Sequence, residues 1–103
     1  MAYINGNGDS EIIRGTNNRD IIYAGGGDDV VYGYGGNDDI DGQSGDDIIY
    51  GGAGQDWIWG SSGVNDLWGG SGADRFLMDF RGDDDSDDYI GDFQLDVDRI
   101  DVR

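Results

Sequence analysis

The residues best suited to chemistry in this chain are acidic, and many of them recur at a fixed spacing. An acidic side chain stands at every ninth position, at Glu11, Asp20, Asp29, Asp38, Asp47, Asp56 and Asp74, except that Asn65 replaces the carboxylate in one unit. Glycine-rich segments precede them, so backbone carbonyls lie beside each carboxylate. Oxygen ligands of this kind suit calcium, which accepts about six to eight flexible contacts, better than they suit magnesium.

Composition excludes several other kinds of chemistry. The chain has 103 residues, 23 acidic and 6 basic, with a net charge of −17 and neither His nor Cys. Zinc and most transition-metal sites need thiolate or imidazole ligands, so they are excluded. The acidic charge repels polyanions, so we expect no nucleic-acid partner. The sequence also has no apolar run long enough for a membrane span.

The acidic spacing belongs to a repeat of nine residues. Consecutive units fill residues 6–77 and begin at Gly6, Gly15, Ala24, Gly33, Gly42, Gly51, Gly60 and Gly69. Their eighth position is always apolar, at Ile13, Ile22, Val31, Ile40, Ile49, Ile58, Leu67 and Phe76. Positions one to six read as a turn, and positions seven to nine as a strand whose middle side chain points inward. A disordered acidic chain would not need this apolar column.

One inward side chain per unit predicts an all-β fold. We expect a right-handed parallel β-roll, a form of β-helix or solenoid, with two units per turn and about four turns. The expected segments are a lead-in over 1–5, the roll over 6–77, and an acidic loop with capping strands over 78–103. Position-six carboxylates on successive turns would lie about 5 Å apart and repel, so the roll needs a cation to become compact.

The unit at residues 51–59, GGAGQDWIW, resembles the nonapeptide of the RTX (repeats-in-toxin) family, a calcium-binding β-helix repeat. The resemblance covers residues 6–77 and implies how each ion is held. One loop supplies the carbonyls of positions one and three and its position-six Asp. The loop eighteen residues on supplies the carbonyls of positions two and four and its own Asp to the same ion. It also implies a secreted, extracellular bacterial protein that leaves by type I export without an N-terminal signal peptide and folds on meeting calcium.

Carried over to this chain, the resemblance implies two sets of calcium ligands. The side chains are those of Asp20, Asp29, Asp38, Asp47, Asp56, Asp74 and Asn65. The backbone carbonyls are those of Gly25, Gly27, Gly33, Gly35, Gly42, Ser44, Gly51, Gly52, Ala53, Gly54, Gly70 and Gly72. We expect three or four ions, and at most six, from the loops present.

The expected sites differ in quality. The best pairs are Asp29 with Asp47, Asp38 with Asp56, and Asp56 with Asp74, and a fourth candidate pairs Asp20 with Asp38. The first two loops, GNGDSE and GTNNRD, depart from the pattern, so their affinity should be lower. Asn65 removes a charge from the site that it shares with Asp47, which should weaken that site.

After residue 77 the period stops. The tail residues Asp88, Ile90, Asp92, Phe93, Asp98, Ile100 and Asp101 resemble the segment that follows the repeats in many RTX proteins. This segment should cap the open end of the roll, and Asp92 and Asp98 are candidate ligands for one more ion. The spacing of Asp83, Asp85 and Asp87 does not match an EF-hand, because Asp88 stands where glycine is required.

The outward positions seven and nine carry apolar side chains that form a candidate partner surface. Its aromatic members are Tyr32, Tyr50, Trp57, Trp59 and Trp68. Strands favour such residues in any case, but a contiguous patch also suits an adjacent enzyme domain, a polysaccharide or a second copy of the chain.

We expect no catalysis from this chain. It has no His, Cys or Lys to activate its serines. Through the resemblance, it fits a non-catalytic part of a secreted protease, lipase or alginate epimerase. A polysaccharide-binding or adhesion module is the alternative function.

Overall fold

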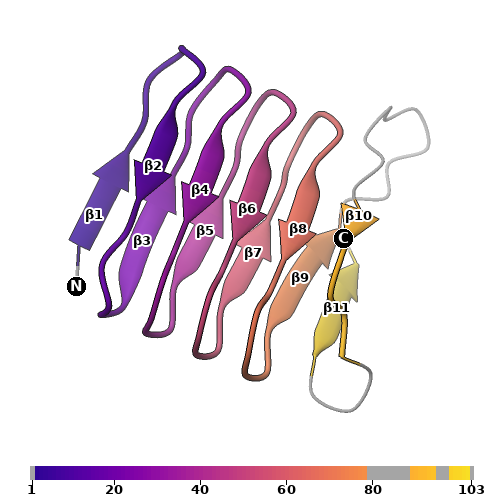
Figure 1. Cartoon of the computed structure of the whole chain (residues 1–103). Helices are drawn as coiled ribbons and strands as arrows, with labels where there is room; N and C mark the ends of the chain where they lie inside the picture. Colours follow the sequence, from indigo (N-terminus) through magenta and orange to yellow (C-terminus); the bar gives the residue numbers. More distant parts are fainter. Residues whose placement is uncertain (1, 79–88, 95–97, 103) are drawn as a thin grey trace.

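The chain folds into a roll of two parallel β-sheets (Figure 1). The computed structural model describes residues 2–78, 89–94 and 98–102. The first sheet contains, in spatial order, β1 (Ala2–Asn5), β3 (Asp20–Tyr23), β5 (Asp39–Asp41), β7 (Trp57–Trp59), β9 (Arg75–Met78) and β11 (Arg99–Val102). The second contains β2 (Ile12–Arg14), β4 (Val30–Tyr32), β6 (Ile48–Tyr50), β8 (Asp66–Trp68) and β10 (Tyr89–Ile90). The predicted all-β parallel roll is therefore confirmed.

The register follows the repeat. Each strand of the array pairs in parallel with the strand two units later, so Ile13 lies beside Val31 and Ile22 beside Ile40. Successive strands of the chain therefore alternate between the two sheets, which gives two units per turn as the period predicts.

The eighth positions of the units form the core between the sheets. Every residue of that apolar column is at most 6 % exposed, and most are completely buried. Their neighbours on the same strands are exposed or half-buried, as the alternation of a short strand requires. The core is therefore a single file of side chains from each sheet.

Packing inside a unit couples its first and eighth positions. A Cβ placed on Gly33 would lie 3.2 Å from Cδ1 of Ile40, so glycine leaves room for the longer core side chain. The unit that begins at Ala24 has a methyl group there, and its eighth position holds the shorter Val31. Both residues are completely buried, so the methyl group gained at position one lies in the same core as the one lost at position eight.

Both ends of the chain add strands to the roll. Residues 2–5, expected as a lead-in, form β1, which pairs with β3. At the other end β10 pairs with β8 and β11 with β9, and the side chains of Ile90 and Phe93 pack against the core. The expected capping strands thus continue the two sheets. The acidic loop over 81–88 lies outside the described residues, and the described part contains no helix long and apolar enough to cross a membrane.

Candidate metal centre

The position-six side chains form a buried ladder along the corners of the roll. Those from Asp20 to Asp74, Asn65 included, are at most 1 % exposed. Oδ1 of Asp56 accepts a 2.9 Å hydrogen bond from the backbone N–H of Asp38, one turn earlier. The same bond joins Asp20 to Asp38, Asp29 to Asp47, Asp47 to Asn65, Asp56 to Asp74, and Asp74 to Asp98. These bonds hold each carboxylate at a fixed place between two loops.

The second carboxylate oxygen has no partner in the loops that follow the repeat pattern. Oδ2 is buried without a hydrogen bond in Asp29, Asp38, Asp47, Asp56 and Asp74. Burial raises the pKa of Asp56 to about 8 and that of Asp38 to about 7. A buried anionic oxygen without a partner is costly, and a bound cation would remove that cost.

Carbonyl oxygens of the next turn face these orphaned atoms. The place that a Cβ on Gly33 would take lies 2.7 Å from Oδ2 of Asp38 and 2.6 Å from the carbonyl oxygen of Gly51. The corresponding place at Gly51 lies 2.7 Å from Oδ2 of Asp56 and 2.9 Å from the carbonyl oxygen of Gly69. The missing side chain at position one therefore leaves a space that two oxygen atoms from different turns line.

Positions two and four supply carbonyls from the opposite side. The carbonyl oxygens of Tyr34 and Gly36 contact the places that a Cβ on Gly52 and Gly54 would take, one turn later. The backbone reaches this arrangement with positive φ, 67° at Tyr34 and 88° at Gly52. In each loop the carbonyls of positions two and four thus point toward the next turn, and the carbonyl of position one points toward the previous turn. The space between two successive loops is therefore lined by carbonyl oxygens from both.

This donor set fits a calcium ion. In the described residues no three acidic side chains come close enough together to hold a metal. An ion between two loops would therefore take its few carboxylate ligands from the ladder and the rest from backbone carbonyls, and calcium accepts such a mixed, flexible oxygen shell.

The first two loops satisfy their own carboxylates. Oδ2 of Asp20 accepts a 2.7 Å bond from the N–H of Thr16, and Oε1 of Glu11 accepts a 2.7 Å bond from the N–H of Asn7. Neither Asn7 nor Thr16 has a positive φ, whereas position two of the later loops does. The sequence signals the difference through the non-glycine residues in these loops, but it does not show that an internal N–H replaces the cation.

The C-terminal carboxylates are also bound by the backbone. Oδ1 of Asp92 accepts a 2.8 Å hydrogen bond from the N–H of Gly69, and Oδ2 accepts a 2.7 Å hydrogen bond from the N–H of Gly70. Asp98 continues the ladder through Asp74, and its Oδ2 accepts the N–H of Gln94 at 2.9 Å. Their role as ligands of a further ion stays a prediction.

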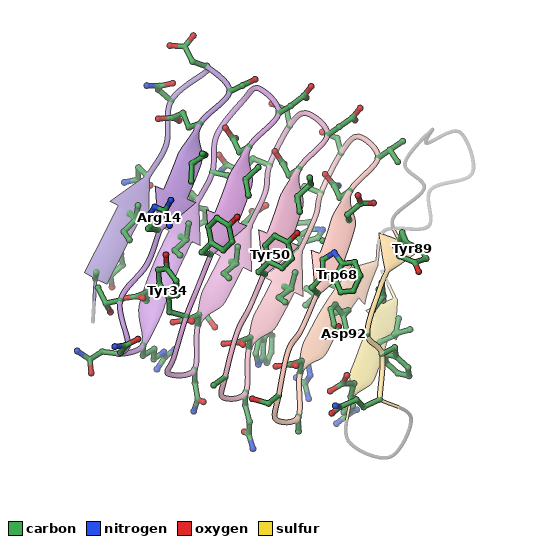
Figure 2. All side chains as sticks on the ribbon, in the orientation of Figure 1. Arg14, Tyr34, Tyr50, Trp68, Tyr89 and Asp92 are labelled. Carbon is green, nitrogen blue, oxygen red and sulfur yellow. The ribbon has the colours of Figure 1, made fainter. Side chains whose placement is uncertain are left out.

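The predicted partner surface divides between the two sheets. On the second sheet the ring of Tyr50 stacks on Tyr32 at 5.2 Å and 7° and on Trp68 at 6.2 Å and 22°, and Tyr89 meets Trp68 edge to face (Figure 2). Ring faces in this column therefore cover one another. Trp57 and Trp59 lie on β7 of the first sheet.

The sequence comparisons agree with this geometry. A family model of four copies of the RTX calcium-binding nonapeptide repeat matches residues 5–40 and again residues 41–76. Searches of curated proteins and of solved structures return no match. Fold, loops and family model together define a calcium-binding β-roll module, a structural rather than a catalytic unit that is typical of extracellular secreted proteins. The chain belongs to the RTX calcium-binding repeat family.

Proposed function

We propose that this protein is a module that folds when calcium binds between its successive loops, as part of a protein exported by type I secretion. The observation that carries this proposal is the row of buried Oδ2 atoms without partners. An internal hydrogen bond serves the equivalent oxygen of Asp20, so the ladder alone does not require orphaned atoms. A bound cation would balance these carboxylates when they are ionised.

The orphaned atoms also support four particular loop pairs as the ion sites. The loop pairs that supply them are 24–29 with 42–47, 33–38 with 51–56, 42–47 with 60–65, and 51–56 with 69–74. The pair 15–20 with 33–38 has one carboxylate already bound by Thr16. We therefore propose about four ions, with the weakest site at Asn65, which supplies no anionic oxygen.

Calcium binding and folding are coupled because the ligands come from loops eighteen residues apart. Without ions, the chain must bury a row of carboxylates within a net charge of −17, which favours the expanded state. A chain that is expanded where calcium is scarce and folds where it is plentiful suits export through a narrow channel. This export context rests on the family, whose repeats are typical of secreted proteins.

The experiment is a calcium titration of the full chain, followed by far-ultraviolet circular dichroism and by isothermal titration calorimetry. We expect calcium to produce β-sheet signal at a stoichiometry near four, and magnesium at the same concentration to produce little. An equally folded chain in excess chelator would overturn the coupling. Folding with a stoichiometry of one or none would overturn the assignment of the loop pairs.

A further inference from the structure

The outer face of the first sheet is hollowed by a groove of about 280 Å³. Its floor is β5, whose outward side chains are the short Asp39 and Asp41, and its sides include Ile21 and Tyr23 of β3 and Trp57 and Trp59 of β7. The strand register explains the hollow. Asp41 lies directly between Tyr23 and Trp59, so a short acidic side chain stands between two large rings.

The dimensions of this trio follow from the sheet. Adjacent strands lie about 4.8 Å apart, so the attachment points of Tyr23 and Trp59 are separated by roughly 9.6 Å with Asp41 midway. With both rings upright on the sheet, a cation over Asp41 would lie about 5 Å from each, inside the roughly 6 Å limit of a cation–π contact. Oδ1 of Asp41 is held by the hydroxyl of Ser61 at 2.7 Å and by the N–H of Gln43 at 2.9 Å, which fixes the carboxylate in place.

The chain already places its own cations on the same surface. The guanidinium of Arg75 lies 4.5 Å from the centre of the Trp57 ring, and that of Arg19 lies 3.4 Å from Oδ2 of Asp39. Aromatic and acidic side chains of this face therefore bind positive groups in the folded protein. The net charge of −17 adds a general attraction for cations.

We propose that the groove between Tyr23 and Trp59 is a binding site for an alkylammonium cation, with Asp41 as its counter-ion. Aromatic cages recognise quaternary ammonium groups, and two strands about 9.6 Å apart leave room for such a group between the two side chains. A neutral sugar could donate hydroxyl hydrogen bonds to Asp41, but it would gain no charge attraction from the acidic floor. The aromatic column of the second sheet offers no such site, because its ring faces stack on one another. This inference goes beyond the proposed role of calcium and uses none of its ligands.

The experiment is an NMR titration of the calcium-loaded full chain with choline, in which the indole N–H signals of Trp57, Trp59 and Trp68 are followed separately. We expect the signals of Trp57 and Trp59 to shift and that of Trp68 to stay. The neutral isostere 3,3-dimethyl-1-butanol should bind at least fivefold more weakly, and salt should weaken the binding of choline.

Two variants test the residues. Asp41→Asn keeps an oxygen acceptor for Ser61 and Gln43 and should weaken choline binding at least fivefold, and Trp59→Leu should weaken it as much. Trp68→Leu, on the opposite sheet, is the matched control and should bind choline as the natural chain does. Circular dichroism with calcium first checks that each variant folds, and Trp59→Leu with the neutral isostere carries the test if Asp41→Asn does not fold.

Three results would overturn the proposal. They are equal binding of choline and its neutral isostere, unchanged affinity in the folded Asp-to-Asn variant, and a shift of the Trp59 signal by a cello-oligosaccharide but not by choline. The last result would assign the groove to a polysaccharide. None of them bears on calcium-coupled folding, which the titration of β-sheet signal tests by itself.

Discussion

Oδ1 of Asn65 accepts a 2.8 Å hydrogen bond from the backbone N–H of Asp47, one turn earlier. The amide therefore keeps its place in the ladder, but its nitrogen donates toward the carbonyl oxygen of Ser62 at 3.4 Å. A nitrogen donor stands where the other loops hold the second carboxylate oxygen, and a calcium ion cannot use it as a ligand.

Restoring the carboxylate should therefore strengthen this site. We expect Asn65→Asp to raise calcium affinity at the loop pair 42–47 with 60–65 about tenfold, because it adds an anionic ligand. In chelator the same change should lower stability by about 1 kcal/mol, since it buries another charge. Calorimetry with calcium and urea unfolding in chelator measure both effects. Unchanged affinity would contradict the placement of an ion at Asn65.

The reverse change tests a loop with a complete carboxylate. Asp56→Asn keeps the oxygen that accepts the N–H of Asp38 but removes the orphaned charge. We expect calcium affinity at the flanking sites to fall tenfold or more, with a loss of calcium-induced β-sheet signal at limiting calcium. Asp66→Asn, an exposed strand residue, is the control for the change in net charge and should have little effect. Equal behaviour of the two variants would count against the ladder as the binding site.

The pKa values predict opposite effects of pH with and without calcium. Burial raises the pKa of Asp56 from 3.8 to about 8, and those of Asp47 and Asp74 to about 7. Without calcium, their contribution to stability is therefore fully present below the ordinary carboxyl pKa and is lost as the pH rises through these folded-state values.

Circular dichroism in chelator should accordingly show more β-sheet at pH 5 than at pH 8. With calcium the trend reverses, because protons compete for the ligands, and apparent affinity should fall tenfold or more between pH 8 and pH 5. Asp56→Asn should weaken both trends. A chelated chain that loses β-sheet on acidification would contradict the assigned burial.

Core packing makes a prediction independent of calcium. Ala24 and Val31 fill together the space that glycine and isoleucine fill in the unit beginning at Gly33. In saturating calcium, Val31→Ile should cost about 1 kcal/mol through overpacking, and Ala24→Gly a similar amount. The double variant recreates the pairing of Gly33 with Ile40, so it should lose less than the sum by about 0.5 kcal/mol or more. Simple additivity in thermal unfolding would refute the coupling.

The C-terminal turn depends on one carboxylate. Asp92→Ala leaves the N–H groups of Gly69 and Gly70 without their acceptor and should destabilise the roll by about 1–3 kcal/mol. Asp66→Ala on the exposed surface is the control. As ligands of a further ion, Asp92 and Asp98 predict that the double variant Asp92→Ala with Asp98→Ala binds one calcium ion fewer. An unchanged number of bound ions would reject that role.

Much of the architecture could be predicted from the sequence, because every unit of the repeat has the same pattern of turn, inward and outward residues. The apolar eighth position predicts which side chains are buried, and the period predicts that Ile22 pairs with Ile40, since two units complete a turn. The residue types likewise predict that the bound metal is calcium. A column of carboxylates beside glycine-rich loops offers oxygen ligands, and the absence of His and Cys excludes most other metals.

The tertiary structure alone decides which of these carboxylates needs a cation. Asp20 and Asp38 occupy the same position of the repeat, yet Thr16 satisfies Oδ2 of Asp20 while Oδ2 of Asp38 has no partner. The difference depends on backbone direction at position two, where Tyr34 has a φ of 67°, and residue type does not fix that direction for a non-glycine residue. The period also places Asp41 between Tyr23 and Trp59, but only the tertiary structure shows that Ser61 and Gln43 hold its carboxylate through hydrogen bonds.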